Sequence, residues 1–183
     1  HDALPILGTR PIKPNARSHT PRRTKLNTRG RPAVSAHLID NEKAELIITM
    51  DTGITANAEA EYCRSRGVEF LCTDHHKIQP EKMPDCIVLN PKMHPHGDYQ
   101  ELCGCGITFV LLRRLAQDFP VSAALWTDLL GLVGMATICD VVPLNPVNHR
   151  LARMGVEGLL KSNREIFKKL MYNSALGATV DEK

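Results

Sequence analysis

The sequence of 183 residues has few aromatic side chains and no long apolar run. Aromatic residues make up 4% of the chain, so base stacking, worth roughly 1–3 kcal/mol for each stacked base, can contribute little to nucleic-acid binding. No run approaches the ~18 consecutive apolar residues of a membrane-spanning helix, and residues 1–20 lack the apolar centre of a signal peptide. We therefore expect no membrane association and a cytoplasmic location.

Acidic residues are absent from residues 3–39, which contain eight Lys and Arg residues. The chain carries a net charge of +3, but the part that follows this segment is net negative. With four prolines between residues 11 and 32 and few apolar side chains, residues 1–32 are poorly suited to a core, and we expect a basic, disordered arm. Clustered Lys and Arg displace counterions from nucleic acid, so the arm is a candidate for phosphate contacts. Simple solubility is the alternative explanation.

Disulfide bonds are not expected, although the chain contains six cysteines. Most of them lie inside apolar runs, where buried free thiols are common. The 43% apolar content is enough for one core, so we expect one domain over residues 33–175 and a tail over residues 176–183.

Two short apolar runs each end in an acidic residue. Residues 46–50 are followed by Asp51, and a second run is followed by Asp74, His75 and His76. The segment between them is rich in Ala and Glu, which predicts a strand, a helix and a parallel strand. The carboxyl ends of neighbouring parallel strands face the same crevice, so these side chains should converge there. Carboxylates and imidazoles at one point suit Mn²⁺ or Mg²⁺.

Further apolar runs predict the remaining elements. A third strand is expected over residues 86–90, ended by Pro91. The run 123–139 predicts a buried helix or a broken helix pair, and Asp140 follows it. Helices are expected over residues 33–41, 107–115, 123–139, 148–160 and 164–171, and the apolar positions of the last two are assigned to the core. The predicted fold class is α/β, with a parallel sheet and a C-terminal helical part.

Gly104 and Gly106 precede the predicted helix 107–115. Glycine allows close backbone approach, and a helix N-terminus offers N–H groups and a positive dipole end to an anion. The two glycines are therefore candidate phosphate-binding residues, with tight packing as the commoner explanation of a lone Gly-x-Gly.

Five motifs in order give the chain a specific resemblance. They are Ile47-Ile-Thr-Met-Asp-Thr-Gly53, Thr73-Asp-His-His76, Leu89-Asn-Pro-Lys92, Cys103-Gly-Cys-Gly106 and Cys139-Asp-Val-Val-Pro-Leu144. From about residue 45 to 171 the chain resembles the catalytic domain of the DHH phosphoesterases, and within them the RecJ-type single-stranded-DNA exonucleases. The last motif, followed by Asn148-His149-Arg150, favours the RecJ type over relatives that cleave cyclic dinucleotides, oligoribonucleotides or pyrophosphate.

The resemblance implies a two-metal site for phosphodiester hydrolysis in the 5′ to 3′ direction. It makes Asp51 the carboxylate that bridges two Mn²⁺ or Mg²⁺ ions, with His75 and Asp140 as ligands of one of them. It also implies that Asp74 orients His75, and that His76 lies near the scissile phosphate. The remaining candidate phosphate or substrate contacts are Gly104, Gly106, Asn148 and Arg150.

The chain departs from the family at the first motif, because no Asp-x-Asp occurs in it. In the family that motif supplies the remaining metal ligands, and residues 1–32 do not resemble the helix and strand that accompany it. The Gly-rich second domain that grips substrate in the family is also not found before Lys183. The resemblance therefore implies an incomplete catalytic domain and impaired activity of this chain alone.

Three alternatives stay open on the sequence. One is a nucleic-acid-binding remnant without catalysis, and another is a different DHH phosphodiesterase that acts on oligonucleotides or cyclic dinucleotides. The third is a structural zinc module formed by His94, His96, Cys103 and Cys105, although its His-x-His and Cys-x-Cys spacing does not match that of closed zinc sites.

Overall fold

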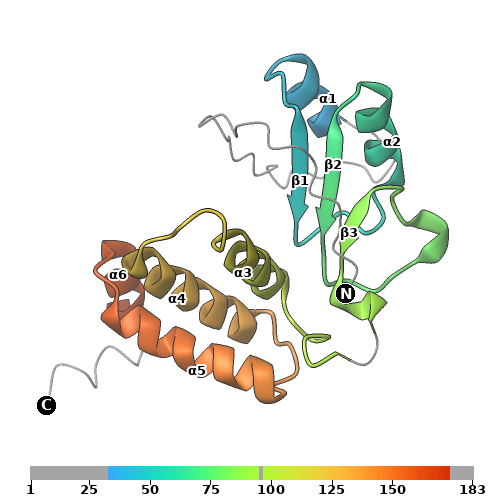
Figure 1. Cartoon of the computed structure of the whole chain (residues 1–183). Coiled ribbons are helices and arrows are strands. Elements are labelled where there is room, and N and C mark those ends of the chain that lie inside the picture. Colours follow the sequence, from blue (N-terminus) through green and yellow to red (C-terminus); the bar gives the residue numbers. More distant parts are fainter. Residues whose placement is uncertain (1–32, 95–96, 174–183) are drawn as a thin grey trace, which may run out of the picture. The chain divides into compact units, whose positions relative to one another are not determined.

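The structure is a computed structural model that describes residues 33–94 and 97–173. The chain divides into two units, His1–Gly30 and Arg31–Lys183, and every described residue lies in the second (Figure 1). The predicted basic arm and the predicted tail therefore lie outside the described residues, and both stay predictions.

A three-stranded parallel sheet carries the predicted strand–helix–strand unit. Its strands are β1 (Leu46–Met50), β2 (Glu69–Thr73) and β3 (Ile87–Leu89), in the order β1-β2-β3. Helix α2 (Asn57–Ser65) connects β1 to β2, as the Ala- and Glu-rich segment predicts. The predicted α/β class with a parallel sheet is confirmed, and the third strand is one residue shorter at each end than expected.

Helices α1 (Ala33–Asp40) and α2 cover one face of the sheet. The core between them consists of apolar side chains that alternate with outward-facing ones along each strand. Its buried members are Ile39, Ile47, Ala60, Cys63, Val68, Phe70 and Cys72. The short elements η1 (Pro80–Lys82) and η2 (Pro91–Met93) flank β3, and α3 (Gly104–Leu115) contacts β1 and β2.

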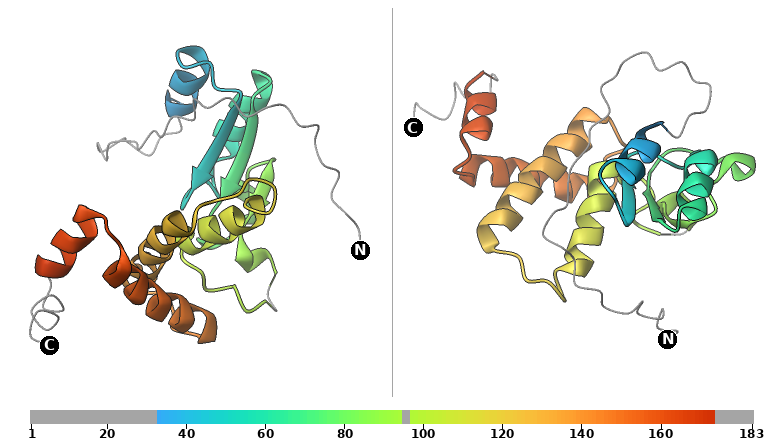
Figure 2. Two further views of the ribbon diagram at one scale, coloured as in Figure 1. Left: turned by 60° about the vertical axis from the view of Figure 1, so that its left-hand side comes forward. Right: turned by 90° about the horizontal axis from the view of Figure 1, so that it is seen from above.

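Three further helices follow α3 and form the C-terminal part (Figure 2). They are α4 (Ala123–Cys139), α5 (Pro146–Lys161) and α6 (Glu165–Asn173). Side chains cap α3, α4 and α5, because Cys103, Ser122 and Asn145 accept hydrogen bonds from N–H groups of the first turn. The predicted helices are confirmed, and α3 begins three residues earlier than predicted, at Gly104.

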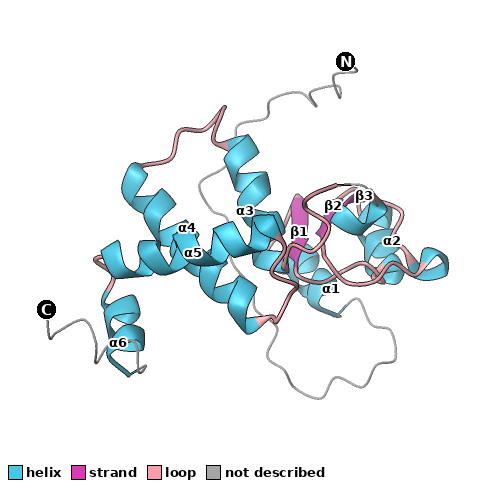
Figure 3. Ribbon diagram, turned by 90° about the horizontal axis from the view of Figure 1, so that it is seen from below, coloured by secondary structure: helices cyan, strands magenta, loops and turns pink. Residues whose placement is uncertain are grey.

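The expectation of a buried helix over residues 123–139 is wrong for most of its length. Helix α4 is one unbroken helix, and its buried positions are Gly131, Val133, Gly134 and Thr137. Its contacts are made with α3 and α5, which lie beside it (Figure 3). Apolar side chains elsewhere on α4, such as Ile138 at 52% exposure, therefore face outward. None of the helices described for residues 33–94 and 97–173 combines the length and the hydropathy needed to cross a bilayer.

Glycines bring the backbones of α4 and α5 into direct contact. A Cβ atom on Gly134 would lie 2.5 Å from the Cα atom of Gly155, and one on Gly155 would lie 2.3 Å from the Cα atom of Gly134. Neither position can accept a side chain without moving a helix, since real Cβ atoms do not approach backbone so closely. This contact fixes α5, and with it the loop that follows Asp140.

Candidate metal centre

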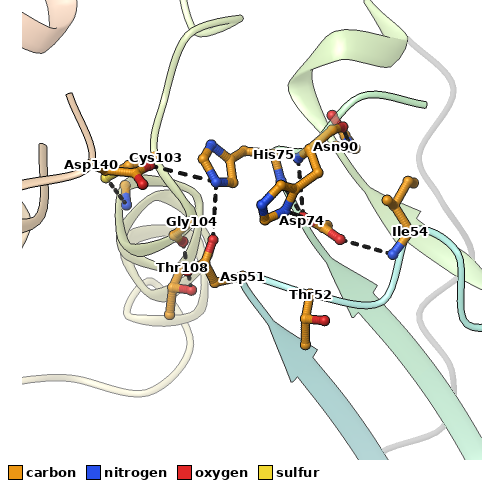
Figure 4. A network of polar contacts seen from close by, with 12 residues as sticks. Asp51, Thr52, Ile54, Asp74, His75, Asn90, Cys103, Gly104, Thr108 and Asp140 are labelled. Atoms are coloured by element: carbon orange, nitrogen blue, oxygen red, sulfur yellow. Dashed lines mark hydrogen bonds and ion pairs between the residues drawn. The ribbon is translucent and has the colours of Figure 1, made fainter. Parts of the chain in front are cut away.

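The carboxyl end of β1 presents Asp51 in a left-handed backbone conformation. The φ angle of Asp51 is 62°, in a region that Asp adopts more readily than most residues because its short side chain can form local hydrogen bonds. Its N–H donates to the carbonyl of Thr73 at 3.0 Å, which ties it to the end of β2. The carboxylate of Asp51 consequently points toward His75 and Gly104 (Figure 4).

Asp74, at the end of β2, is a buried carboxylate with four hydrogen-bond donors. It is 1% exposed and accepts from the N–H groups of Ile54 (2.8 Å), His75 (2.8 Å) and His76 (3.1 Å) and from Nδ1 of His76 (2.6 Å). Burial raises the pKa of Asp74, but the hydrogen bonds from His76 and Ile54 outweigh burial and bring the pKa below its ordinary value. Asp74 is therefore ionised at neutral pH.

The expectation that Asp74 orients the imidazole of His75 is wrong. Asp74 contacts His75 only through the main-chain N–H, and the ring that it holds is that of His76. The bond to Asp74 occupies Nδ1 of His76 and makes Nε2 the nitrogen available to an external partner. This carboxylate–histidine pair is the arrangement that commonly orients a metal-binding imidazole.

His75 joins two carboxylates from distant parts of the chain. Its Nε2 lies 3.1 Å from Oδ1 of Asp51 and 3.5 Å from Oδ2 of Asp140 (Figure 4). The side chain of His75 is 13% exposed and its ring packs edge-on against that of His76, with 4.6 Å between the ring centroids. The predicted convergence of the two strand ends is therefore present, and α4 adds a third acid to it.

Asp140 reaches this point because α4 ends there in a strained turn. Its N–H still donates to the carbonyl of Ala136 at 2.9 Å, so it closes the last turn of the helix. The next residue, Val141, has a φ angle of 54°, which is costly for a β-branched side chain, and it is 84% exposed. The prediction that Asp140 lies at the end of an element agrees with this position.

Gly104 makes room for Asp51 at the start of α3. A Cβ atom on Gly104 would lie 2.3 Å from Oδ1 and 2.6 Å from Cβ of Asp51. The predicted close approach at this glycine is present, but its partner in the structure is the carboxylate of the same site. Gly106 is buried, and a Cβ atom there would lie 3.1 Å from Leu102, so tight packing explains it.

Asp51, His75 and His76 form the group of possible metal ligands in the described part of the chain. Each offers one ligand atom, and these atoms all lie within 4.8 Å of one another. A carboxylate with two imidazoles suits a borderline divalent cation such as Mn²⁺. The group contains Asp51 and His75 as predicted, has His76 in place of Asp140 as its third member, and leaves Asp140 in contact with His75.

The two candidates on α5 differ in accessibility. Asn148 has no exposed surface, and its Nδ2 donates to the carbonyls of Glu101 (2.6 Å) and Pro143 (2.8 Å). The prediction of Asn148 as a substrate contact is therefore wrong, because the side chain holds two loops together. Arg150 is exposed, and its role stays a prediction.

Asn90 is a site residue to which the sequence assigned no role. It is 2% exposed, its Nδ2 donates to the carbonyl of His76 at 3.0 Å, and its Oδ1 accepts from the N–H of Lys92 at 3.0 Å. The signal was a polar residue after a third apolar run, at the same edge of the sheet as Asp51 and Asp74.

The structure indicates roles other than zinc binding for Cys103 and Cys105, the two cysteines of the zinc alternative. The Sγ atom of Cys103 accepts from the N–H of Gly106 at 3.4 Å and caps α3. Burial, followed by Cys103 and Asp51, raises the pKa of Cys105 to about 11, which disfavours a thiolate ligand. His96 lies outside the described residues.

Comparison with known proteins identifies relatives for most of the chain. A model of the "DHH family, N-terminal domain" matches residues 4–137. The single-stranded-DNA-specific exonuclease RecJ of Bacillus subtilis is 39% identical over 129 residues, which are 69% of this chain and 15% of that protein. The protein of the same name from Haemophilus influenzae is 31% identical over 130 residues, 66% of this chain and 22% of that protein.

Two solved structures share the fold. RecJ from Thermus thermophilus in complex with Mn²⁺ has a TM-score of 0.66 and 27% identity, and the similarity covers 77% of this chain and 21% of that one. Exonuclease RecJ bound to manganese has a TM-score of 0.63 and 28% identity, over 74% of this chain and 34% of that one. The chain thus spans no more than about a third of these relatives.

The matched range differs from the one that the motifs suggest. It begins at residue 4 and not near residue 45, so the basic opening segment falls within it. It ends at residue 137, before Asp140, so the α5 and α6 region lies beyond this family model.

Proposed function

The chain belongs to the DHH family, and from this premise we propose that it carries part of the metal-dependent active site of a 5′ to 3′ exonuclease acting on single-stranded DNA. The names of the curated relatives and the manganese in the two similar structures support this proposal. The set of carboxylate and imidazole ligands also supports the proposal, because it suits Mn²⁺ or Mg²⁺.

The observation that carries the proposal is the convergence of Asp51, His75 and His76. These residues come from the ends of two strands, and Asp140 joins them from the end of α4. In open parallel sheets, ligands bind outside the carboxyl ends of the strands, where this group lies. A divalent ion bound there would supply Lewis-acid stabilisation of the charge on phosphate oxygens.

The protein residues have separate tasks in this proposal. Asp51 and His75 hold the ion, with Asp140 as a further ligand or as a partner of His75. Asp74 fixes the ring of His76 by its bond to Nδ1, so that Nε2 can face the ion or the phosphate. Because Asp74 is buried and ionised, it also favours a proton on Nδ1 of His76 and leaves Nε2 as the acceptor.

Calorimetric titration with Mn²⁺, combined with an exonuclease assay on 5′-phosphorylated single strands, tests the proposal. We expect weak binding at no more than one site, since no Asp-x-Asp is present in the chain. An Asp51→Ala, His75→Ala double variant should lose this binding. Asp118→Ala is the control, because its carboxylate pairs with Arg114 at 3.0 Å on the surface. Absent Mn²⁺ binding, or unchanged binding in the double variant, contradicts the proposal.

A second candidate is nucleic-acid binding with little or no hydrolysis by this chain alone. Two observations favour it: the missing Asp-x-Asp and the eight basic residues of the opening segment. With only Asp51 to hold a second ion, a metal-activated water would be poorly positioned. Robust Mn²⁺-dependent turnover that the double variant abolishes would refute this candidate.

We also propose a cytoplasmic location. All six cysteines are free, as expected for proteins in a reducing compartment. Fractionation of cells that produce the protein would test the location.

A further inference from the structure

Two side chains from the end of β3 hold the main chain of the histidine pair. Nδ2 of Asn90 donates to the carbonyl of His76 at 3.0 Å, and Nζ of Lys92 donates to the carbonyl of His75 at 2.6 Å. Asn90 in turn accepts from the N–H of Lys92, which caps η2. The adjacent carbonyls of the pair are thus each fixed by a side chain of the Asn90-Pro91-Lys92 segment.

The contact to His75 leaves most of the hydrogen-bonding capacity of Lys92 unused. A lysine ammonium has three N–H donors and no acceptor, and the carbonyl of His75 takes one of them. Lys92 is exposed, so the remaining donors are accessible. Holding one carbonyl does not require a positive charge, because a neutral donor forms the same bond.

The positive charge of Lys92 attracts an anion that approaches the site. Asp51, Asp74 and Asp140 bring three carboxylates to this end of the sheet, and they repel a phosphate electrostatically. The hydrogen bond to the His75 carbonyl fixes a cation on the main chain of the residue whose ring contacts Asp51 and Asp140. A lysine held in this way loses less side-chain freedom when it binds than a lysine that extends freely into solvent.

We propose that Lys92 binds a phosphate oxygen of the substrate and is held beside the histidine pair by the carbonyl of His75. The inference rests on the proposed function and assigns one residue to its phosphate contact. Lys92 follows Asn90 at the sheet edge that carries Asp51, so the phosphate that it contacts is one next to the metal-binding group.

Binding of a 5′-phosphorylated oligothymidylate, measured over a series of salt concentrations, tests this role. In single strands each neutralised phosphate contributes about −0.7 to the slope of log K against log salt. Lys92→Met should flatten the slope by about 0.7 and weaken binding roughly 10-fold at low salt, the value of one charge-assisted hydrogen bond. Lys92→Gln should behave in the same way, while Lys92→Arg should keep most of the slope.

Lys82→Met is a matched control. Lys82 also lies in a short helix that begins with proline, η1, and its Nζ also donates to a local oxygen, that of Gln79 at 2.7 Å. It should leave the slope unchanged. A residue that only supported the local fold would lower the unfolding midpoint without changing the number of phosphates neutralised, so the slope separates the two roles.

The outcomes distinguish this inference from the proposed function. An unchanged slope in Lys92→Met and Lys92→Gln overturns the phosphate contact, and so does a parent chain that does not bind the oligonucleotide. Mn²⁺ titration of the same samples tests the metal group independently. The salt series is run both with and without Mn²⁺. If the metal group proves not to bind Mn²⁺, the slope measured without Mn²⁺ still decides whether Lys92 contacts a phosphate.

Discussion

Substitution of Gly104 by alanine should disrupt the metal group although it adds only one methyl group. The new Cβ atom would lie 2.3 Å from Oδ1, 2.5 Å from Cγ and 2.6 Å from Cβ of Asp51. A change of rotamer can move the carboxylate but not the Cβ atom of Asp51, so the backbone of the β1 end or of α3 has to shift. The carboxylate then leaves its place 3.1 Å from Nε2 of His75.

The effect on stability is the difference between two opposing terms. Alanine in place of glycine in a helix ordinarily stabilises by about 0.5–1 kcal/mol. Overpacking of this kind costs about 1–3 kcal/mol. We therefore expect Gly104→Ala to lower the free energy of unfolding by roughly 0.5–2 kcal/mol, with a loss of Mn²⁺ binding comparable to that of Asp51→Ala.

Urea unfolding and Mn²⁺ calorimetry on the same preparation measure both consequences. Gly106→Ala is the control in the same helical turn, because the nearest atoms to its Cβ atom would be those of Leu102, at 3.1 Å, and Sγ of Cys103, at 3.6 Å, and not those of Asp51. It should keep its Mn²⁺ affinity. Unchanged Mn²⁺ affinity in Gly104→Ala would refute the reasoning, since it would mean that the position of Asp51 does not matter for the metal.

Four further predictions concern the fold and the opening segment. Asp74→Asn should cost about 1–3 kcal/mol of unfolding free energy, since an amide cannot accept all four hydrogen bonds. Because folding lowers the pKa of Asp74, the difference in unfolding free energy between parent and variant should be full above about pH 4 and shrink on acidification below it. Urea titrations at several pH values measure this difference. Val141→Gly should raise the unfolding free energy by about 0.5–1 kcal/mol in urea titrations, because glycine removes the penalty of the left-handed φ at an exposed side chain. Gly134→Val should lower the thermal midpoint by 10 °C or more, on the order of 3 kcal/mol, as it separates α4 from α5 at Gly155, whereas an equal midpoint would contradict the close contact. Deletion of residues 1–32 should flatten the salt dependence of single-strand binding, and an unchanged slope would leave this segment as a solubilising tail.

The sequence predicted the elements of the fold because each is specified by local chemistry. The apolar runs before Asp51 and Asp74 form neighbouring parallel strands, and parallel pairing alone brings their ends together. The contact between His75 and Asp140 could be anticipated only from the motif order, since residues from different elements carry it.

Side-chain partners at the site were harder to predict because several residues compete for the same hydrogen bonds. Asp74 lies within two residues of both histidines in the chain, and only the turn after β2 decides that its partner is the ring of His76. Asn148 has the polar character of a substrate contact, but its position in the first turn of α5 directs it toward the carbonyls of Glu101 and Pro143. The apolar content of α4 likewise predicts burial, yet the glycine contact with α5 covers only one side of the helix.

Two of the strained backbone positions of the described chain lie at the candidate metal site. Among the residues that the structure describes, three other than glycine have a left-handed φ, namely Lys43, Asp51 and Val141, and each costs on the order of 1–2 kcal/mol. Lys43 lies in the turn between α1 and β1, away from any ligand group, so strain alone does not mark function. Asp51 and Val141, by contrast, set the carboxylates on the two sides of His75, one directly and one through the preceding Asp140. Glycine would serve either turn at lower cost, but at residue 51 it would remove the carboxylate, so a requirement for that side chain explains why the strain persists there.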